Sequence, residues 1–149
     1  MCRWKGLTSR GIIATEAAKP KPQTMLSELQ YVLDSQPDLE LAVLVGSRAE
    51  GRARAESDWD IAIQWKRELT LLENLAHTET LCRLLASALG VEEDDVDLID
   101  LPRAGLAMRA LVAEEGVPLK GEDSLAWNHF LGRTWRELEA YEWEKQHAA

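Results

Sequence analysis

The sequence has little cysteine and no long apolar run, and each shortage excludes a class of protein. Its 149 residues include two cysteines, Cys2 and Cys82, which form neither a disulfide framework nor a spacing typical of metal ligands. A reducing compartment is therefore expected, and we predict a cytoplasmic location. No apolar run approaches the roughly 18 residues that a membrane span needs, so we expect a soluble chain without a membrane partner.

Positive charge is also scarce, since 17 Lys and Arg stand against 26 Asp and Glu, giving a formal net charge of −9. This balance argues against a general nucleic-acid coat and against a binder of anionic membranes, because both need clustered positive charge. Residues 1–24 hold five of the basic residues and one acid, which leaves 12 basic and 25 acidic residues, or −13, for the rest. Proteins or small molecules are the expected partners.

The charge asymmetry coincides with a predicted boundary. Residues 1–24 have no apolar stretch typical of a signal peptide, and Pro20 and Pro22 bar a continuous helix. We interpret residues 1–24 as a flexible basic extension, or as the result of a start assigned upstream of Met25, and residues 25–149 as one domain. Such a domain can bury a core but leaves no room for a separate acceptor domain, so another molecule is expected to present the acceptor.

Hydrophobic periodicity predicts helices and strands in alternation along residues 25–149. Helices are predicted over residues 25–34, 69–89 and 103–115, followed by a terminal helix capped by Ser124. Strands are predicted over residues 39–45, 58–63 and 96–101, with a short extended piece at 117–119. The order predicts an α/β fold with a small sheet flanked by helices. The apolar stripe expected on the long helix comprises Leu72, Leu75, Ala76, Leu85 and Leu89.

The segment between the first two predicted strands carries the strongest functional signal. A buried strand stops at Gly46-Ser47 and turns into a short helix, which presents backbone N–H groups and a hydroxyl suited to phosphate oxygens. Asp58 and Asp60 stand at i and i+2 on the next strand, so both carboxylates lie on one face. Hard oxygen ligands beside a phosphate cradle predict Mg²⁺.

A third carboxylate on a neighbouring strand would complete a site for two metal ions. Asp97 and Asp100 are the candidates, and because they lie on opposite faces of their strand only one can join the pair. Alternation alone does not decide between them. Three carboxylates on one face repel one another unless a cation neutralises them, so the pattern itself calls for metal.

These residues resemble the minimal nucleotidyltransferase (MNT) family of the polymerase-beta-like superfamily. The signature of that family is Gly-Ser, ten residues, then Asp-x-Asp, and here Gly46-Ser47 is followed by ten residues and Asp58-Trp59-Asp60. The resemblance implies a polymerase-beta-like fold with a mixed sheet, and it selects Asp97 as the third carboxylate. It also implies nucleotidyl transfer from a nucleoside triphosphate with release of pyrophosphate.

By the same resemblance, each site residue takes a role. Asp58, Asp60 and Asp97 would be catalytic metal ligands for two Mg²⁺ ions, and Gly46 and Ser47 would hold the terminal phosphates. Arg48 is the preferred one of three loop arginines for contact with the triphosphate, against the plain alternative that such arginines are solvated. The other two are Arg52 and Arg54.

Short members of the family look like the antitoxin half of HEPN/MNT toxin–antitoxin modules. The resemblance implies that this chain binds a HEPN ribonuclease toxin and transfers AMP from ATP to a toxin tyrosine hydroxyl. Two alternatives stay open: a nucleotide-binding antitoxin that acts by steric occlusion alone, and a nucleotidyltransferase with another acceptor.

The terminal helix is unusually aromatic. Trp127, Trp135 and Trp143 accompany Phe130 and Tyr141 within seventeen residues, more than one helix face can bury against a small sheet. Because aromatic side chains are enriched at interface anchors, we predict that part of this helix contacts the partner protein. Packing of Trp127 and Trp135 into the core is the alternative.

Overall fold

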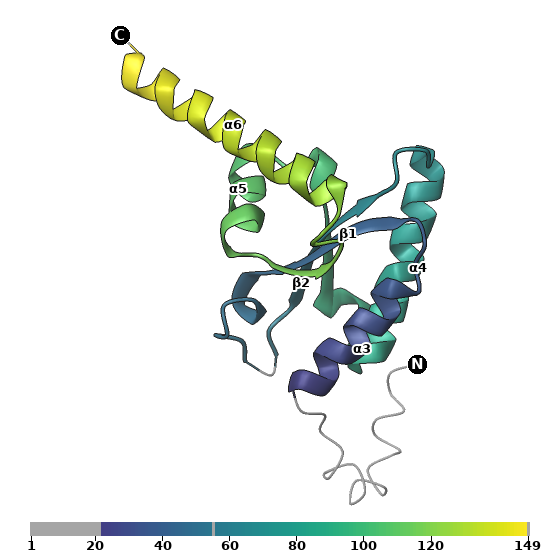
Figure 1. The fold of residues 1–149 in the computed structure, drawn as a ribbon. Coiled ribbons are helices and arrows are strands. Elements are labelled where there is room, and N and C mark those ends of the chain that lie inside the picture. Colours follow the sequence, from purple (N-terminus) through teal and green to yellow (C-terminus); the bar gives the residue numbers. More distant parts are fainter. Residues whose placement is uncertain (1–21, 55, 149) are drawn as a thin grey trace, which may run out of the picture.

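The computed structural model describes residues 22–54 and 56–148, which form a four-stranded sheet with helices on both faces (Figure 1). The helices are α3 (Pro22–Asp34), α4 (Leu71–Leu89), α5 (Leu106–Glu115) and α6 (Leu125–His147). The strands are β1 (Leu39–Val45), β2 (Trp59–Trp65), β3 (Val96–Asp100) and β4 (Val117–Lys120). In the order β3-β2-β1-β4, β1 runs antiparallel to β2 and β4, whereas β2 runs parallel to β3. The predicted mixed sheet flanked by helices is confirmed.

Strand β1 is buried along nearly its whole length because both of its faces are covered. Leu39, Ala42 and Leu44 belong to the core beneath α3 and α4, while Leu41 and Val43 belong to the core beneath α5 and α6. An irregularity in the register between Leu39 and Leu41 sets the faces of these residues. The continuous apolar run that predicted this strand thus reflects burial on two sides.

The parallel pair β2 and β3 requires a crossover, and α4 supplies it. Thr70 and Glu73 form a reciprocal capping box at its start, and Gly90 ends it in the left-handed conformation (φ 69°). The predicted stripe is wrong at Leu72 and Leu75, which are 77% and 57% exposed, and at Ala76, which is also exposed. The first turns of α4 lie beyond the apolar core that covers its later turns.

The remaining elements begin close to where the sequence predicts. Ser124 accepts a hydrogen bond from the backbone N–H of Trp127 and caps α6, as expected. Helix α5 begins at Leu106 rather than 103, because Leu101–Arg103, with Pro102 inside it, forms a separate 3-10 turn. Helix α3 begins at Pro22, which suits the first turn of a helix where no N–H bond is needed.

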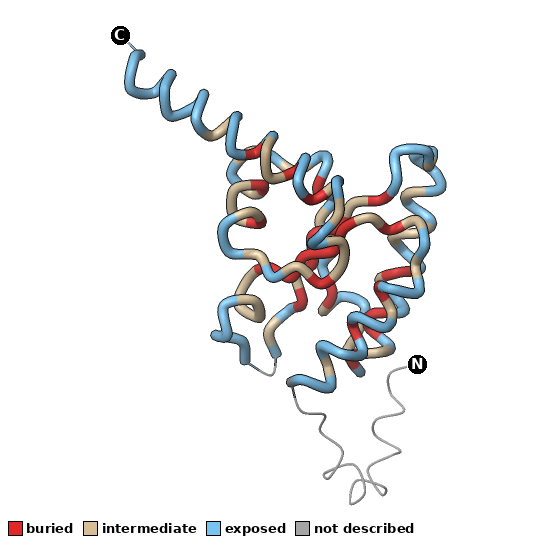
Figure 2. The backbone as a smooth tube through the Cα atoms, in the orientation of Figure 1, coloured by how far each residue is buried: buried red, intermediate tan, exposed pale blue. Residues whose placement is uncertain are grey.

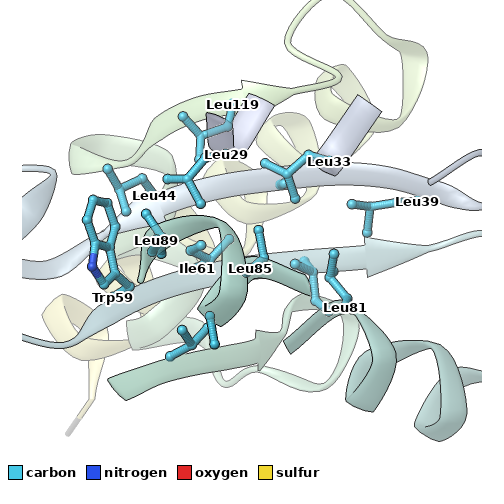
Figure 3. Close-up of a cluster of buried hydrophobic side chains, with 14 of the residues drawn as sticks. Leu29, Leu33, Leu39, Leu44, Trp59, Ile61, Leu81, Leu85, Leu89 and Leu119 are labelled. Atoms are coloured by element: carbon cyan, nitrogen blue, oxygen red, sulfur yellow. The ribbon is translucent and has the colours of Figure 1, made fainter. Parts of the chain in front are cut away.

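Two cores hold the layers together, and the buried residues concentrate around the sheet (Figure 2). The core shown in Figure 3 joins β1 and β2 to α3 and α4 and includes Leu29, Trp59, Ile61 and Leu85. The second core lies on the opposite face of the sheet and involves α5 and α6. Its buried members are Leu41, Val43, Val45, Ala62, Leu101, Val112, Trp127 and Phe130.

The extension predicted for residues 1–24 falls mostly outside the described residues, as does Cys2. Cys82 is partly buried, and its thiol lies 3.8 Å from the carbonyl oxygen of Val96, which fits a packed helix residue. Over the ranges that the structure describes, none of the helices combines the length and apolar character needed to cross a bilayer.

Candidate active site

The strands bring the signature residues to one end of the sheet. Val45, the last residue of β1, pairs with Asp60 of β2, and Asp60 pairs in turn with Asp97 of β3. Gly46 follows Val45 directly and begins the turn after β1, so it lies one residue beyond the level at which Asp60 and Asp97 pair. Asp58 precedes β2 by one residue and is exposed at this end.

The register resolves the choice between the two candidate aspartates of β3. Asp97 lies opposite Asp60, and residues opposite each other in a sheet project to the same face. Asp100 lies opposite Ile63, which packs in the core beneath α3 and α4, and its carboxylate is 3.5 Å from Nε of Arg103. Asp97 is therefore the candidate that projects to the same face of the sheet as Asp60, and it is also the one that the family resemblance selects.

Position 46 requires glycine for two reasons, its backbone conformation and the lack of space for a Cβ atom. Its φ of +76° lies in the left-handed region, and a Cβ atom there would come within 2.5 Å of Oδ2 of Asp60. Its carbonyl oxygen accepts hydrogen bonds from the N–H groups of Ala49 (3.1 Å) and Glu50 (3.2 Å), which closes the turn after β1. The signature glycine thus allows the backbone to approach the carboxylate of Asp60, fourteen positions along the chain, without a clash.

Electrostatics single out Asp60 among the carboxylates. Burial raises the pKa of Asp60 above its ordinary value, and the negative charges of Asp97 and Asp58 raise it further. These are the interactions expected where like charges meet in a partly buried place. A bound cation would relieve both effects.

The donor chemistry of this end of the sheet suits a hard divalent cation, because carboxylate oxygens are what Mg²⁺ prefers. However, within residues 22–54 and 56–148 no three His, Cys, Asp or Glu side chains are already gathered into a group that could hold a metal ion. The backbone brings Asp60 and Asp97 together, whereas coordination of one ion by all three aspartates requires reorientation of their side chains.

Arg48 has a structural role that the sequence did not reveal. Its guanidinium donates to the carbonyl oxygen of Ser57, with Nη2 at 2.7 Å and Nε at 3.1 Å, and lies 4.0 Å from the ring centroid of Trp59. Burial lowers the pKa of Arg48, and the charge of Asp58 partly offsets this. Arg48 thus links the start of the loop to its end, next to Asp58 and Asp60.

The other loop residues make local contacts. Ser47 lies directly after Gly46, is partly buried, and accepts a hydrogen bond at its carbonyl oxygen from the N–H of Arg52 (2.9 Å). The guanidinium of Arg52 contacts the carboxylate of Glu50, and the N–H of Arg54 donates to the hydroxyl of Ser57 at 2.8 Å. Such contacts shape the turn that delivers Asp58 to the site.

Two residues near the site escaped the sequence analysis. Trp59 reads as a strand residue, but its ring also supports Arg48. Glu115, at the end of α5, shares a hydrogen bond with Glu50 that raises the pKa of Glu115. The pKa of Glu50 is lowered, chiefly by its hydrogen bond to Arg52. The contact of Trp59 with Arg48 and that of Glu115 with Glu50 both join residues distant in sequence, so no local motif could have revealed them.

The three tryptophans of α6 separate into two groups. Trp127 is 8% exposed and packs on Phe130, with ring centroids 5.2 Å apart, so the prediction that it contacts a partner is wrong and its packing alternative is right. Trp135 and Trp143 are 39% and 61% exposed. Helix α6 buries its first turns against β1 and α5, whereas its last turns are exposed (Figure 2).

Comparison with known proteins matches residues 27–125 to the family described as "Polymerase beta, Nucleotidyltransferase". The protein adenylyltransferase MntA of Shewanella oneidensis (strain ATCC 700550 / MR-1) is 37% identical over 93 residues, which is 62% of this chain and 62% of that protein. The chain thus matches less than two thirds of the length of this relative.

Two solved structures are also similar. One is a toxin–antitoxin complex with AMP-PNP, in which the matched chain is 29% identical with a TM-score of 0.61, covering 81% of this chain and 92% of that one. The other is a tri-AMPylated Shewanella oneidensis HEPN toxin in complex with its MNT antitoxin, with 28% identity and a TM-score of 0.59, covering 85% and 93%.

Proposed function

The chain belongs to the polymerase beta nucleotidyltransferase family, and from this premise we propose that it is an adenylyltransferase antitoxin. It transfers AMP from ATP to a tyrosine hydroxyl of a HEPN ribonuclease toxin and thereby silences the toxin. The observation that carries the proposal is the pairing of Val45, Asp60 and Asp97 across three neighbouring strands, with Gly46 close to the carboxylate of Asp60. The protein adenylyltransferase that matches in sequence and the AMPylated complex that matches in structure support it.

The carboxylates and the glycine turn have complementary roles in this proposal. Asp58, Asp60 and Asp97 would hold Mg²⁺, and Gly46 and Ser47 would seat the terminal phosphates of ATP. When bound, Mg²⁺ supplies charge neutralisation for the triphosphate and the departing pyrophosphate. Arg48 stabilises the turn before Asp58 through Ser57 and Trp59, and its positive charge lies near the triphosphate site.

The reaction forms one P–O bond, breaks another and moves one proton. The tyrosine oxygen attacks the α-phosphorus of ATP, the bond from the α-phosphorus to the oxygen that bridges to the β-phosphorus breaks, and pyrophosphate leaves. The hydroxyl proton passes to a nearby base. Asp97 is exposed on β3, at the edge of the sheet, so it is accessible to an acceptor on another protein and suits this role.

The partner and location follow from the same chemistry. Asp97 and Asp58 are exposed at this end of the sheet, so a second protein can bring its hydroxyl to them. We place the reaction in the cytoplasm, where ATP is available as the AMP donor, and we assign residues 25–149 to the catalytic domain.

The test is transfer of label from ATP labelled at the α-phosphate to purified HEPN toxin in the presence of Mg²⁺. We expect Asp58→Asn with Asp60→Asn to lower the rate by more than about a hundredfold, since even outer-shell partners of metal ligands cost about 10–100-fold. Asp100→Asn is the matched control, because this residue lies on the same edge strand but faces away from Asp60, and it should retain transfer.

Three outcomes bear on the proposal. Loss of transfer in the double variant and not in Asp100→Asn supports it. If the intact chain transfers no label yet still inhibits the toxin, steric occlusion is the correct mechanism. If label appears only on another acceptor, the chain is a nucleotidyltransferase with a different substrate.

A further inference from the structure

Helix α6 extends beyond the body of the protein (Figure 1). Its first turns bury Trp127, Phe130 and Thr134, whereas every residue from Glu139 to Ala148 is exposed (Figure 2). The last three turns therefore gain nothing from the core of this chain. A helix end of this length in water needs another source of stability, and tertiary packing is the usual one.

The apolar stripe of α6 continues past the point where the body ends. Trp127, Leu131, Thr134, Leu138 and Tyr141 follow one another at alternating steps of four and three residues. This spacing keeps them on one face and is the seam pattern by which helices pack against helices. Trp127 and Leu131 lie in or against the second core and Thr134 is buried, but Leu138 is half-buried and Tyr141 is 53% exposed.

Two negative charges lie beside this uncovered seam, and Lys145 occupies its next position, four residues after Tyr141. Glu142 lies one residue after Tyr141 and Glu144 lies three residues after Tyr141, so the two glutamates flank the seam on opposite sides. Flanking charges of this kind select a packed partner by opposite sign. A second copy of this chain would bring the same glutamates and its own net charge of −9 to the contact, so self-pairing is disfavoured.

Ion pairs of Glu137 with two arginines, one of them buried, fix the orientation of the exposed end of α6. The guanidinium of Arg109 on α5 is buried, donates to the carbonyl oxygen of Ala104 at 3.2 Å and pairs with Glu137. Arg133 pairs with the same carboxylate at 3.1 Å. Glu137 is thus fixed where α6 leaves the body, and the seam beyond it is presented in one orientation.

We propose that Leu138 and Tyr141, with Trp135 beside them, form a docking seam for a helix of the partner protein, and that basic residues of this helix meet Glu142 and Glu144. The identity of the partner as a HEPN toxin rests on the function proposed above. Trp143, which the sequence analysis assigned to the partner interface, lies two residues from Tyr141, about 200° around the helix, and the proposed seam therefore leaves it out.

The experiment measures the affinity of the full chain for purified HEPN toxin by calorimetry, with Leu138→Ala and Tyr141→Ala combined. Aromatic anchors dominate most interfaces, so we expect the dissociation constant to rise at least about tenfold. Glu142→Lys with Glu144→Lys should also weaken binding, and more so at low salt, because this variant reverses the complementary charge.

Two matched controls remove apolar surface elsewhere. Trp143→Ala lies on the opposite face of α6, and Leu72→Ala lies on the exposed part of α4; neither should change the affinity. All four variants alter exposed or half-buried side chains, so thermal unfolding should match that of the unchanged chain. A ligand that binds only the folded state raises its stability, so Mg²⁺ and ATP should raise the unfolding temperature of the seam variant as much as that of the unchanged chain, since the seam lies apart from the carboxylates.

The outcomes separate this proposal from the proposed function. If the seam variant binds toxin as tightly as the unchanged chain, the seam is overturned whether or not AMP is transferred. If this chain alone sediments as a dimer that Tyr141→Ala dissociates, a second copy covers the seam and the proposal is also overturned. If the seam variant loses affinity while the unchanged chain transfers no AMP, the seam stands and the transferase function fails.

Discussion

Among the residues of the candidate site, Gly46 leaves little room for a side chain. A side chain there must adopt the left-handed φ of +76° and also displace Oδ2 of Asp60 from 2.5 Å. We expect Gly46→Ala to lower the free energy of unfolding by about 1–3 kcal/mol, the range for such backbone strain. AMP transfer should fall as well, because Asp60 must move. Urea unfolding and the label-transfer assay measure the two effects.

Gly51 offers a matched control in the same loop. Its φ of +74° is nearly the same, but a Cβ atom there would meet nothing within 4 Å. Gly51→Ala should therefore show the backbone cost alone and keep its transfer activity. Equal loss of activity in the two variants would mean that the contact between Gly46 and Asp60 has no part in the reaction.

Asp60 makes the stability of the protein depend on pH in an unusual direction. Burial, Asp97 and Asp58 raise its pKa, so the folded state binds this proton more tightly than the unfolded state does. The ionised carboxylate thus costs stability, and the cost grows as pH rises from the ordinary pKa through the raised one. Without Mg²⁺ at neutral pH, Asp60→Asn should unfold at a higher temperature than the unchanged chain.

The pH series supplies the decisive comparison for Asp60. The stability gained by Asp60→Asn should disappear in acid below both pKa values, where the unchanged side chain is also neutral. Thermal unfolding between about pH 3 and pH 7, in the presence of a chelator, measures this difference. A gain of the same size at every pH would assign it to packing and would contradict the electrostatic account. Asp123→Asn, an exposed site far along the chain, controls for loss of a negative charge.

Among the secondary-structure elements, the junction of α5 and α6 carries the clearest prediction. Arg109 and then Arg133 hold the pKa of Glu137 below its ordinary value through hydrogen bonds. A lowered carboxyl pKa contributes stability that is present above the ordinary pKa and is lost as pH falls through the lowered one. Glu137→Gln should therefore lower the unfolding temperature at neutral pH and reduce its dependence on acid.

Glu139→Gln is the control for this junction, since Glu139 is exposed two residues further along the same helix. It should leave the acid profile unchanged. Circular dichroism followed through thermal unfolding in both variants measures the effect. If Glu137→Gln and Glu139→Gln behave alike, the ion pair between Arg109 and Glu137 does not contribute to the stability of the protein.

The ends of the elements were more predictable than their faces. The predicted helix ends at residues 89 and 115 and the predicted cap at Ser124 agree with the structure, because capping depends on residues adjacent in the chain. Leu72 and Leu75 have the spacing of a core stripe but are exposed. Periodicity reports which residues share a face and cannot report how far the neighbouring core extends.

At the scale of the whole molecule, the part of the site that lies close together in sequence was predictable, whereas the part brought together by the fold was not. Gly46, Asp58 and Asp60 belong to one short segment, so their spacing alone reveals them. The choice of Asp97 over Asp100 depends on the register between β2 and β3, which are joined by the whole of α4. The sequence alternation leaves that choice open, and only the family resemblance anticipated it.

The edges of the sheet have a consequence for self-association. One edge is β3, five residues long and carrying Asp97 and Asp100, and the other is β4, four residues long and interrupted by Pro118. Short length, charge and proline each discourage the addition of a foreign strand. Two copies meeting along β3 would oppose their aspartates at about 5 Å, the spacing of neighbouring strands. The aspartates of β3 therefore also discourage aggregation through this edge. Neutralising them by substitution should lower the solubility of the protein.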